Sequence, residues 1–315
     1  MDKNYMTGIY LAPMEGVTTH IYRRIFNKYY SGPDKYFTPF LSPNQTKSFQ
    51  MKELEEIDNE KNAGMVTVPQ LLCANAEHFI WACKEIAERG YNEVNFNLGC
   101  PSNTVVTKKK GSGFLFYPDE LDAFFEKVFE GVKSLGVEIS VKTRLGKHDP
   151  KEFERILEIY NRYPIKELIV HPRIQKDFYK GEIRREWLDY AYENSKNPIC
   201  VNGDIFLKEN LEENEKKYPE AVAFMLGRGL IARPYLFTDG DRLKNKETFK
   251  AFNKELLDAY CERMSGDFSI LCKLKELWYY MLPALDLSKD DEKSLKKTTK
   301  VTEYRCLINE LIEKA

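Results

Sequence analysis

The chain has 315 residues, of which 43% are hydrophobic and 13% aromatic, and its formal net charge is −1. This composition is typical of a globular protein with a packed core and excludes a fibrous or disordered chain. No apolar run approaches the roughly 20 residues that a membrane-spanning helix needs, and the first residues lack the apolar core of a signal peptide.

The seven cysteines have no repeating spacing and no CxxC pair. They therefore resemble neither a secreted disulfide framework nor a zinc ribbon. This use of cysteine fits a reducing cytoplasm, and we expect a cytoplasmic monomer without a metal ion or a membrane partner.

Eight short segments of strand character follow one another along the chain, at 9–11, 36–41, 65–71, 93–97, 138–142, 168–171, 199–202 and 223–226. Amphipathic stretches with helical periodicity lie between most of them, such as 76–89, 118–134 and 151–160. This alternation predicts an α/β protein with a (β/α)8 TIM barrel. A doubly wound sheet alternates in the same way but rarely needs so many units.

The pattern changes after Pro234. No β-branched strand run follows residue 241, and the segments 246–264, 268–282 and 291–314 are expected to be helices, with Gly266 and Pro283 between them. We therefore expect a catalytic barrel over residues 1–240 and a small helical bundle over residues 241–315.

Polar or glycine-rich residues stand where almost every predicted strand ends. A barrel brings the carboxyl ends of its strands together on one face, where active sites lie. The glycines after the last two strands would let backbone amides approach a phosphate, and Arg228 would add a charged contact. The strand ends in question are 12–16, Gln70, 97–100, 142–144, 171–173, 202–204 and 227–229.

Cys100 is the candidate catalytic residue, because it follows the strand 93–97 directly and lies between a glycine and a proline that force a turn. The alternative is a small buried cysteine in a tight turn. Lys108, Lys109 and Lys110 follow on the same loop. Most short lysine runs are solvated, but this one lies close enough to Cys100 to contact a polyanionic substrate.

The motifs together resemble the tRNA-dihydrouridine synthase family, in order and spacing, from about Leu11 to Phe237. The resemblance rests on LAPMEGVTTHIYRR, NFNLGCPSNTVVTKKKGSGFL, VKTRLG, the HPR segment with Tyr179-Lys180-Gly181 and Trp187, CVNGD, and LGRGLIARPYLF. It implies an FMN-binding barrel with a C-terminal helical bundle. It also implies reduction of the C5–C6 double bond of specific tRNA uridines, with NADPH to re-reduce the flavin.

Carried over by position, the resemblance implies a role for each matching residue. Cys100 would be the general acid that protonates C5, and Asn97 would help to position the uracil. Contacts to FMN would come from Pro13, Met14, Glu15, Gln70, Lys142, His171, Asn202, Gly203, Asp204, Gly227 and Arg228. Contacts to tRNA would come from Lys108, Lys109, Lys110, Arg144 and Arg173.

Two positions depart from the family pattern. Pro172 stands where the family commonly has a small residue, and Cys73 stands where many members have glycine. Neither change removes a reacting group. Two other functions remain open at this point: a barrel flavoenzyme that acts on free pyrimidines or enones, and a flavin-containing RNA-binding protein without catalysis.

Overall fold

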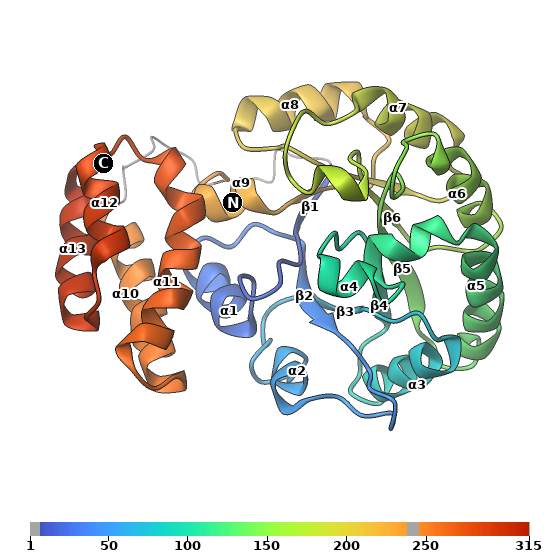
Figure 1. The fold of residues 1–315 in the computed structure, drawn as a ribbon, viewed down its shortest axis with the longest axis horizontal. Helices are drawn as coiled ribbons and strands as arrows, with labels where there is room; N and C mark the ends of the chain where they lie inside the picture. Colours follow the sequence, from blue (N-terminus) through green and yellow to red (C-terminus); the bar gives the residue numbers. More distant parts are fainter. Residues whose placement is uncertain (1–6, 238–245, 315) are drawn as a thin grey trace.

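The eight strands form one closed parallel barrel in the computed structural model, which describes residues 7–237 and 246–314 (Figure 1). Each strand pairs with the next along the chain, and the last pairs with the first. The predicted TIM barrel is therefore confirmed. The strands are β1 (Gly8–Leu11), β2 (Lys35–Leu41), β3 (Thr67–Leu71), β4 (Glu93–Leu98), β5 (Glu138–Arg144), β6 (Leu168–His171), β7 (Ile199–Asn202) and β8 (Ala223–Leu226).

Helices cover the outside of the barrel. Most of them connect one strand to the next, as a parallel barrel requires. They are α1 (His20–Tyr29), α2 (Met51–Glu56), α3 (Ala76–Ala87), α4 (Asn103–Val106), α5 (Pro118–Val132), α6 (Glu152–Tyr160), α7 (Arg185–Asn194), α8 (Lys208–Lys217) and α9 (Arg228–Ala232), with the short 3₁₀ helices η1 (Gly111–Phe116) and η2 (Gln175–Asp177).

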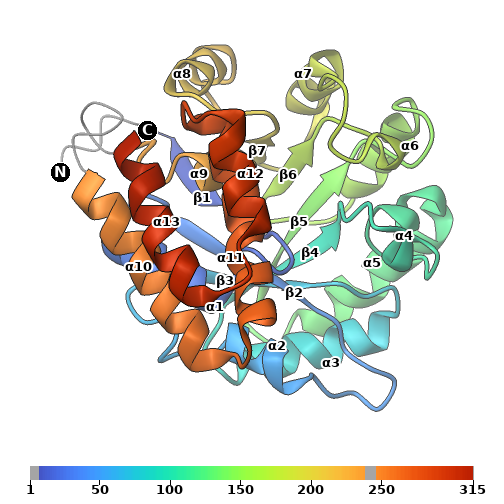
Figure 2. The ribbon, with the colours of Figure 1, turned by 60° about the vertical axis from the view of Figure 1, so that its left-hand side comes forward.

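The last part of the chain is helical and lies beside the barrel (Figures 1 and 2). The boundary predicted at residue 240 falls outside the described residues. The single helix predicted over 291–314 is wrong: two helices occupy this region, because Thr298 leaves the helical conformation with ψ 129°. The elements are α10 (Lys246–Arg263), α11 (Asp267–Met281), η3 (Leu282–Ala284), α12 (Lys289–Lys297) and α13 (Val301–Lys314).

The two faces of β4 differ in chemistry. Val94, Phe96 and Leu98 belong to the apolar core around the barrel, whereas the alternate residues Asn95 and Asn97 belong to the opposite face. Besides these polar side chains, the structure has a second apolar cluster, separate from the core around the barrel. It consists of Tyr10, Ala12, Phe37, Val68, Ile169, Cys200, Ala223 and Met225.

Aromatic packing holds the helical bundle against the barrel. The ring of Phe252 in α10 lies 6.0 Å from that of Tyr22 and 5.2 Å from that of Tyr30. In α11, Lys273 Nζ donates to the backbone oxygen of Gly16 at 2.6 Å. The bundle therefore contacts the loop between β1 and α1, which begins where β1 ends at the barrel mouth.

We expect Phe252→Ala to destabilise the protein by about 3–5 kcal/mol, because it empties a fully buried site between α1 and α10. Chemical denaturation measures the loss. Phe268→Ala is the matched control, since Phe268 in α11 is 81% exposed. Equal losses in the two variants would contradict the aromatic contact as the attachment of the bundle.

Candidate active site at the carboxyl end of the barrel

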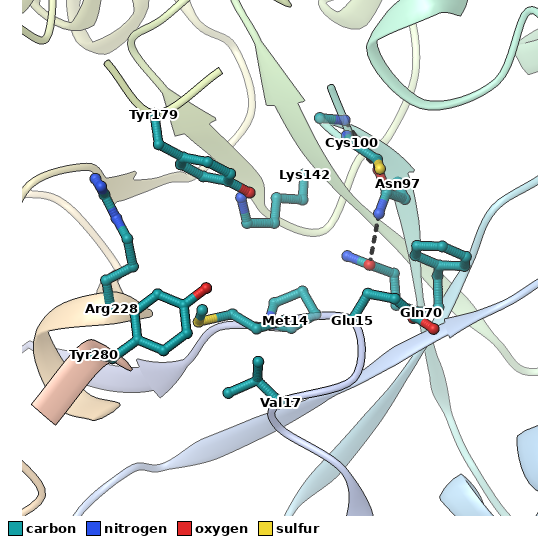
Figure 3. A pocket seen from close by; sticks show the side chains of 13 residues that line it. Met14, Glu15, Val17, Gln70, Asn97, Cys100, Lys142, Tyr179, Arg228 and Tyr280 are labelled. Atoms are coloured by element: carbon teal, nitrogen blue, oxygen red, sulfur yellow. Dashed lines mark hydrogen bonds between the residues drawn. The ribbon is translucent and has the colours of Figure 1, made fainter. Parts of the chain in front are cut away.

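A cavity of about 230 Å³ opens where the strands end. It brings together the predicted residues Pro13, Met14, Glu15, Gln70, Asn97, Cys100, Lys142 and Arg228. Val17, Phe40, Gly99, Tyr179 and Tyr280 complete the lining. Figure 3 shows these side chains converging from several strands, as expected for the active-site face of a TIM barrel.

The Cys100 loop is fixed by hydrogen bonds from both sides. Asn97 Oδ1 accepts from the backbone N–H of Gly99 at 3.0 Å and of Cys100 at 2.9 Å. Ser112 donates to the Cys100 carbonyl oxygen through its N–H and its hydroxyl, at 3.1 and 2.8 Å. Gly111 is required here, because a Cβ at this position would lie 2.8 Å from that oxygen and its φ is +56°.

The Cys100 thiol is a proton donor at neutral pH. Burial raises its pKa above the ordinary value, and the nearby carboxyl of Glu15 acts in the same direction. Arg144 and Lys142 oppose this effect only in part. A protonated thiol at the edge of a cavity can act as a general acid toward a bound ligand.

Lys142 places a cation in the wall of the same cavity (Figure 3). Burial lowers its pKa from 10.5 to about 8, and the positive charge of Arg144 contributes to this shift. None of the described residues forms a hydrogen bond or ion pair with its ammonium group. A partly buried cation without a partner fits an anionic ligand.

A charged network lies next to the cavity. Arg173 donates to both carboxylate oxygens of Asp204, at 2.8 and 2.6 Å, and Arg228 donates to Asp204 at 2.6 Å. An Arg173 N–H also lies 3.2 Å from His171 Nε2. Because arginine only donates, this nitrogen accepts and the imidazole carries its proton on Nδ1.

Burial and four surrounding cations lower the pKa of His171 well below its ordinary value. The ring is therefore neutral at physiological pH. The cations are Arg144, Lys142, Arg173 and Arg228. A site with this excess of positive charge favours a phosphate or another anion.

Other predicted cofactor residues lie beside the cavity rather than in its lining. Asn202 Nδ2 donates to the Met225 carbonyl oxygen at 2.7 Å and so ties β7 to β8. A Cβ on Gly227 would lie 3.3 Å from Ala12 Cβ and 3.4 Å from Met14 Sδ, so the end of β8 lies directly against the segment that follows β1. Gly203 and Asp204 continue the chain from Asn202, and Asp204 orients the two arginines.

The arginines predicted to contact tRNA are not at the surface. Arg144 and Arg173 are each 1% exposed. Arg144 donates to the carbonyl oxygens of Gly99 and Ile174, and Arg173 is paired with Asp204. Both guanidinium groups are thus buried and paired in this structure, and their contact with tRNA stays a prediction. Arg144 still borders the cavity, since its guanidinium lies 5.2 Å from the Tyr179 ring.

The three lysines after Cys100 differ in their environment. Lys109 pairs with Glu120 at 2.9 Å, and Lys110 Nζ donates to Ser42 Oγ at 2.9 Å. Lys108 is exposed, and no described residue pairs with its side chain. Of this run, Lys108 is the side chain most available to a polyanion.

Sequence reasoning gave no role to three aromatic residues of the lining, Phe40, Tyr179 and Tyr280. Tyr179 was within a recognised motif but had no assigned role, although it lies between Arg144 and Arg228, 5.1 Å from the latter. Tyr280 comes from α11 in the helical bundle. No sequence signal identifies it, because only tertiary packing brings α11 to the barrel mouth.

The described residues contain no group of three or more histidine, cysteine, aspartate or glutamate side chains that could hold a metal ion. They also contain no helix long and apolar enough to cross a membrane.

The solved structures that resemble this chain share its TIM-barrel fold. A 2-naphthoyl-CoA reductase is similar with a TM-score of 0.55 and 11% identity, over 72% of this chain and 49% of that one. Morphinone reductase in complex with tetrahydroNAD is similar with a TM-score of 0.50 and 10% identity, over 72% and 84%. These likenesses support the fold.

The family model for dihydrouridine synthase matches residues 10–303. tRNA-dihydrouridine synthase B of Pasteurella multocida (strain Pm70) is 30% identical over 241 residues, which are 76% of this chain and 70% of that protein. A probable tRNA-dihydrouridine synthase of Staphylococcus aureus (strain Mu50) is 31% identical over 269 residues, 79% and 74% of the two chains. The chain belongs to the dihydrouridine synthase family.

We expect Lys142→Met to stabilise the flavin-free protein at pH 7 by up to about 3 kcal/mol, because it removes a cation whose pKa folding lowers to about 8. From pH 8 to 10.5 the unfolded chain keeps a proton that the folded protein releases, so wild-type stability rises with pH. The advantage of the variant should therefore disappear near pH 10.5.

Denaturant unfolding at several pH values measures this difference. Lys108→Met, at an exposed lysine, is the control and should change stability by less than about 0.5 kcal/mol at each pH. A Lys142→Met protein no more stable than wild type at pH 7 would contradict the interpretation of Lys142 as an uncompensated cation.

Proposed function

We propose that this protein reduces the C5–C6 double bond of specific uridines in tRNA to dihydrouridine, with FMN as cofactor and NADPH as electron donor. Membership of the dihydrouridine synthase family and the names of its relatives support this reaction and substrate. The observation that carries the proposal is one cavity with a protonated thiol, Cys100, and an unpartnered cation, Lys142.

The residues of the cavity fit FMN by charge. Lys142 would face the N1/O2 edge of the isoalloxazine ring, where a reduced flavin carries negative charge. Arg228, held by Asp204, would pair with the phosphate, with Gly203 and Gly227 leaving room for it. Neutral His171 and Gln70 would supply hydrogen bonds without adding charge.

The protein's own groups would carry the proton and place the base. When bound, FMN supplies the hydride that adds to uracil C6. Cys100 would give its thiol proton to C5, and the resulting thiolate would take a proton back from solvent. Asn97 would hold the base in reach of the thiol. Because the cavity lies inside the barrel mouth, the uridine must be turned out of the folded tRNA.

In this proposal, residues 1–240 carry the chemistry and the helices of 241–315 add surface for tRNA. Among the three loop lysines, Lys108 is the one most available to contact tRNA, because it is exposed and no described residue pairs with its side chain. The monomeric state and the cytoplasmic location expected from the sequence stay predictions.

We expect Cys100→Ala to abolish dihydrouridine formation, because it removes the proton donor, while flavin content and tRNA affinity stay at the wild-type level. Nucleoside mass spectrometry of unmodified tRNA incubated with protein, FMN and NADPH measures the product. Cys272→Ala is the control, since Cys272 is exposed on α11. A wild-type protein that forms no dihydrouridine at any flavin loading would refute the proposal.

The phosphate contact has a separate test. Arg228→Met should weaken FMN binding roughly 10- to 100-fold, the range for one charge-assisted hydrogen bond. Riboflavin lacks the phosphate, so its affinity should be the same in wild type and variant. A variant that loses both ligands equally would place the role of Arg228 elsewhere in the site.

A further inference from the structure

A continuous chain of hydrogen bonds runs through the inside of the barrel, starting below the Cys100 loop. Asn97 Nδ2 donates to Gln70 Oε1 at 2.8 Å, as the dashed line in Figure 3 marks. Gln70 Nε2 donates to Asn95 Oδ1, also at 2.8 Å. The chain thus passes from β4 to β3 and back to β4.

The chain continues to the opposite end of β4. Asn95 Nδ2 donates to Ser140 Oγ at 3.0 Å, and the Ser140 hydroxyl donates to Glu93 Oε1 at 2.8 Å. Asn95 and Ser140 are completely buried, and Glu93 is 5% exposed. Lys35 and Lys166 hold the other oxygen of Glu93, at 2.9 and 3.3 Å.

The two ends of this series of hydrogen bonds fix the direction in which each bond is donated. At the upper end, backbone N–H groups of Gly99 and Cys100 only donate, so the Asn97 atom that faces them is its oxygen. At the lower end, the Glu93 carboxylate, paired with two lysines, only accepts. Every amide between them can then have only one orientation. Turning any one of them would set like groups against each other in a buried site, at a cost of the order of 1–3 kcal/mol per lost bond.

We propose that Asn95, Ser140 and Glu93 are positioning residues, which act through Gln70 and Asn97 to fix the Cys100 loop and the hydrogen-bonding character of Asn97 toward the substrate base. With Oδ1 taken by two backbone amides and one Nδ2 hydrogen by Gln70, Asn97 has one N–H left. It can bind only an acceptor.

This orientation has a consequence for the choice of base, which rests on the proposed function. A remaining N–H donor pairs with a carbonyl oxygen such as O4 of uracil. Cytosine presents an amino group at the same position, so two donors would face each other and one would stay unpaired in a buried site. The orientation of Asn97, fixed from both ends of the hydrogen-bond chain, would thus favour uracil over cytosine at the edge where Asn97 lies.

Ser140→Ala is the most conservative substitution that interrupts this series of hydrogen bonds, because it removes one oxygen atom and leaves no sizeable void. Asn95 then loses its acceptor, and the orientation of the amides above it is held only from the upper end, by the backbone N–H groups of Gly99 and Cys100. We expect kcat for uridine reduction to fall about 10-fold or more, since small displacements of a reacting group have effects of this order. The KM for tRNA should stay within about 2-fold.

Ile169→Val is the matched control, because Ile169 is also fully buried inside the barrel but belongs to its apolar cluster. It should leave kcat unchanged. Glu93→Gln supplies a second cut at the lower end, although it also disturbs the pairs with Lys35 and Lys166.

Asn95→Asp provides a readout that a merely structural role would not move. The atom that faces Ser140 must donate, so the new carboxyl group can replace the amide only in its protonated form. We expect near wild-type kcat at low pH and a new decline as pH rises through the pKa of that group. The wild-type protein should lack this limb of the pH profile.

Alkylation of Cys100 tests the inference without any turnover. The full-length protein is treated with iodoacetamide at a series of pH values, and peptide mass spectrometry resolves Cys100 from the other cysteines. In Ser140→Ala the Asn97 side of the loop loses its support while the bonds from Ser112 remain, so we expect the thiol to be less buried and its pKa to fall. A fall of one unit raises the thiolate fraction, and with it the rate at neutral pH, about tenfold.

The outcomes separate the two proposals. Faster alkylation of Cys100 in Ser140→Ala but not in Ile169→Val supports the positioning role, even if the wild-type protein forms no dihydrouridine and the proposed function fails. Unchanged alkylation and unchanged kcat in Ser140→Ala would overturn the positioning role while leaving the proposed function intact. A flat pH profile in Asn95→Asp would overturn the fixed polarity of the chain.

Discussion

The burial of positive charge at the carboxyl end of the barrel constrains everything around it. Four cations, Lys142, Arg144, Arg173 and Arg228, lower the pKa of His171. Burial, together with a neighbouring positive charge, lowers the pKa of Lys142 and of Arg144. Isolated buried cations are costly unless they are paired. Asp204 compensates two of the arginines, and backbone carbonyls accept from Arg144.

Lys142 differs from these arginines, because no described residue forms a hydrogen bond or ion pair with its ammonium group. The strand that carries it, β5, also carries Arg144, so the two cations enter the mouth of the barrel from one strand. A bound anion would complete the pairing, which supports the proposal that this site binds the phosphate and the reduced ring of FMN. The unpaired charge of Lys142 thus destabilises the flavin-free protein, and the same charge would contribute to the affinity for an anionic cofactor.

The neutral polar groups inside the barrel also need partners, because they are buried. Asn95, Ser140 and Gln70 are as deeply buried as the neighbouring valines, and each is satisfied by the next. Such a chain tolerates no missing partner, because the loss of one group leaves another unpaired. It connects Glu93, whose carboxylate is paired with two lysines, with the loop that presents Cys100.

The sequence allowed the barrel and much of the site to be predicted, for identifiable reasons. The alternation in β4 and the turn after it were enough to place Cys100 at the end of a strand. The burial of the Arg144 side chain was not predictable from the sequence. It depends on the carbonyl oxygens of Gly99 and Ile174, which only the folded barrel places beside the guanidinium group. Tyr280 was missed because the position of α11 is set by contacts between the bundle and the barrel, such as that of Lys273 with Gly16.

Nucleoside mass spectrometry of tRNA from cells with and without this gene, mapped by position, tests the proposed reaction most directly. We predict that dihydrouridine disappears at one or a few positions when the gene is removed and returns when the wild-type gene, but not its Cys100→Ala variant, is supplied. Unchanged dihydrouridine at every position, in a cell without a second enzyme of this family, would contradict it.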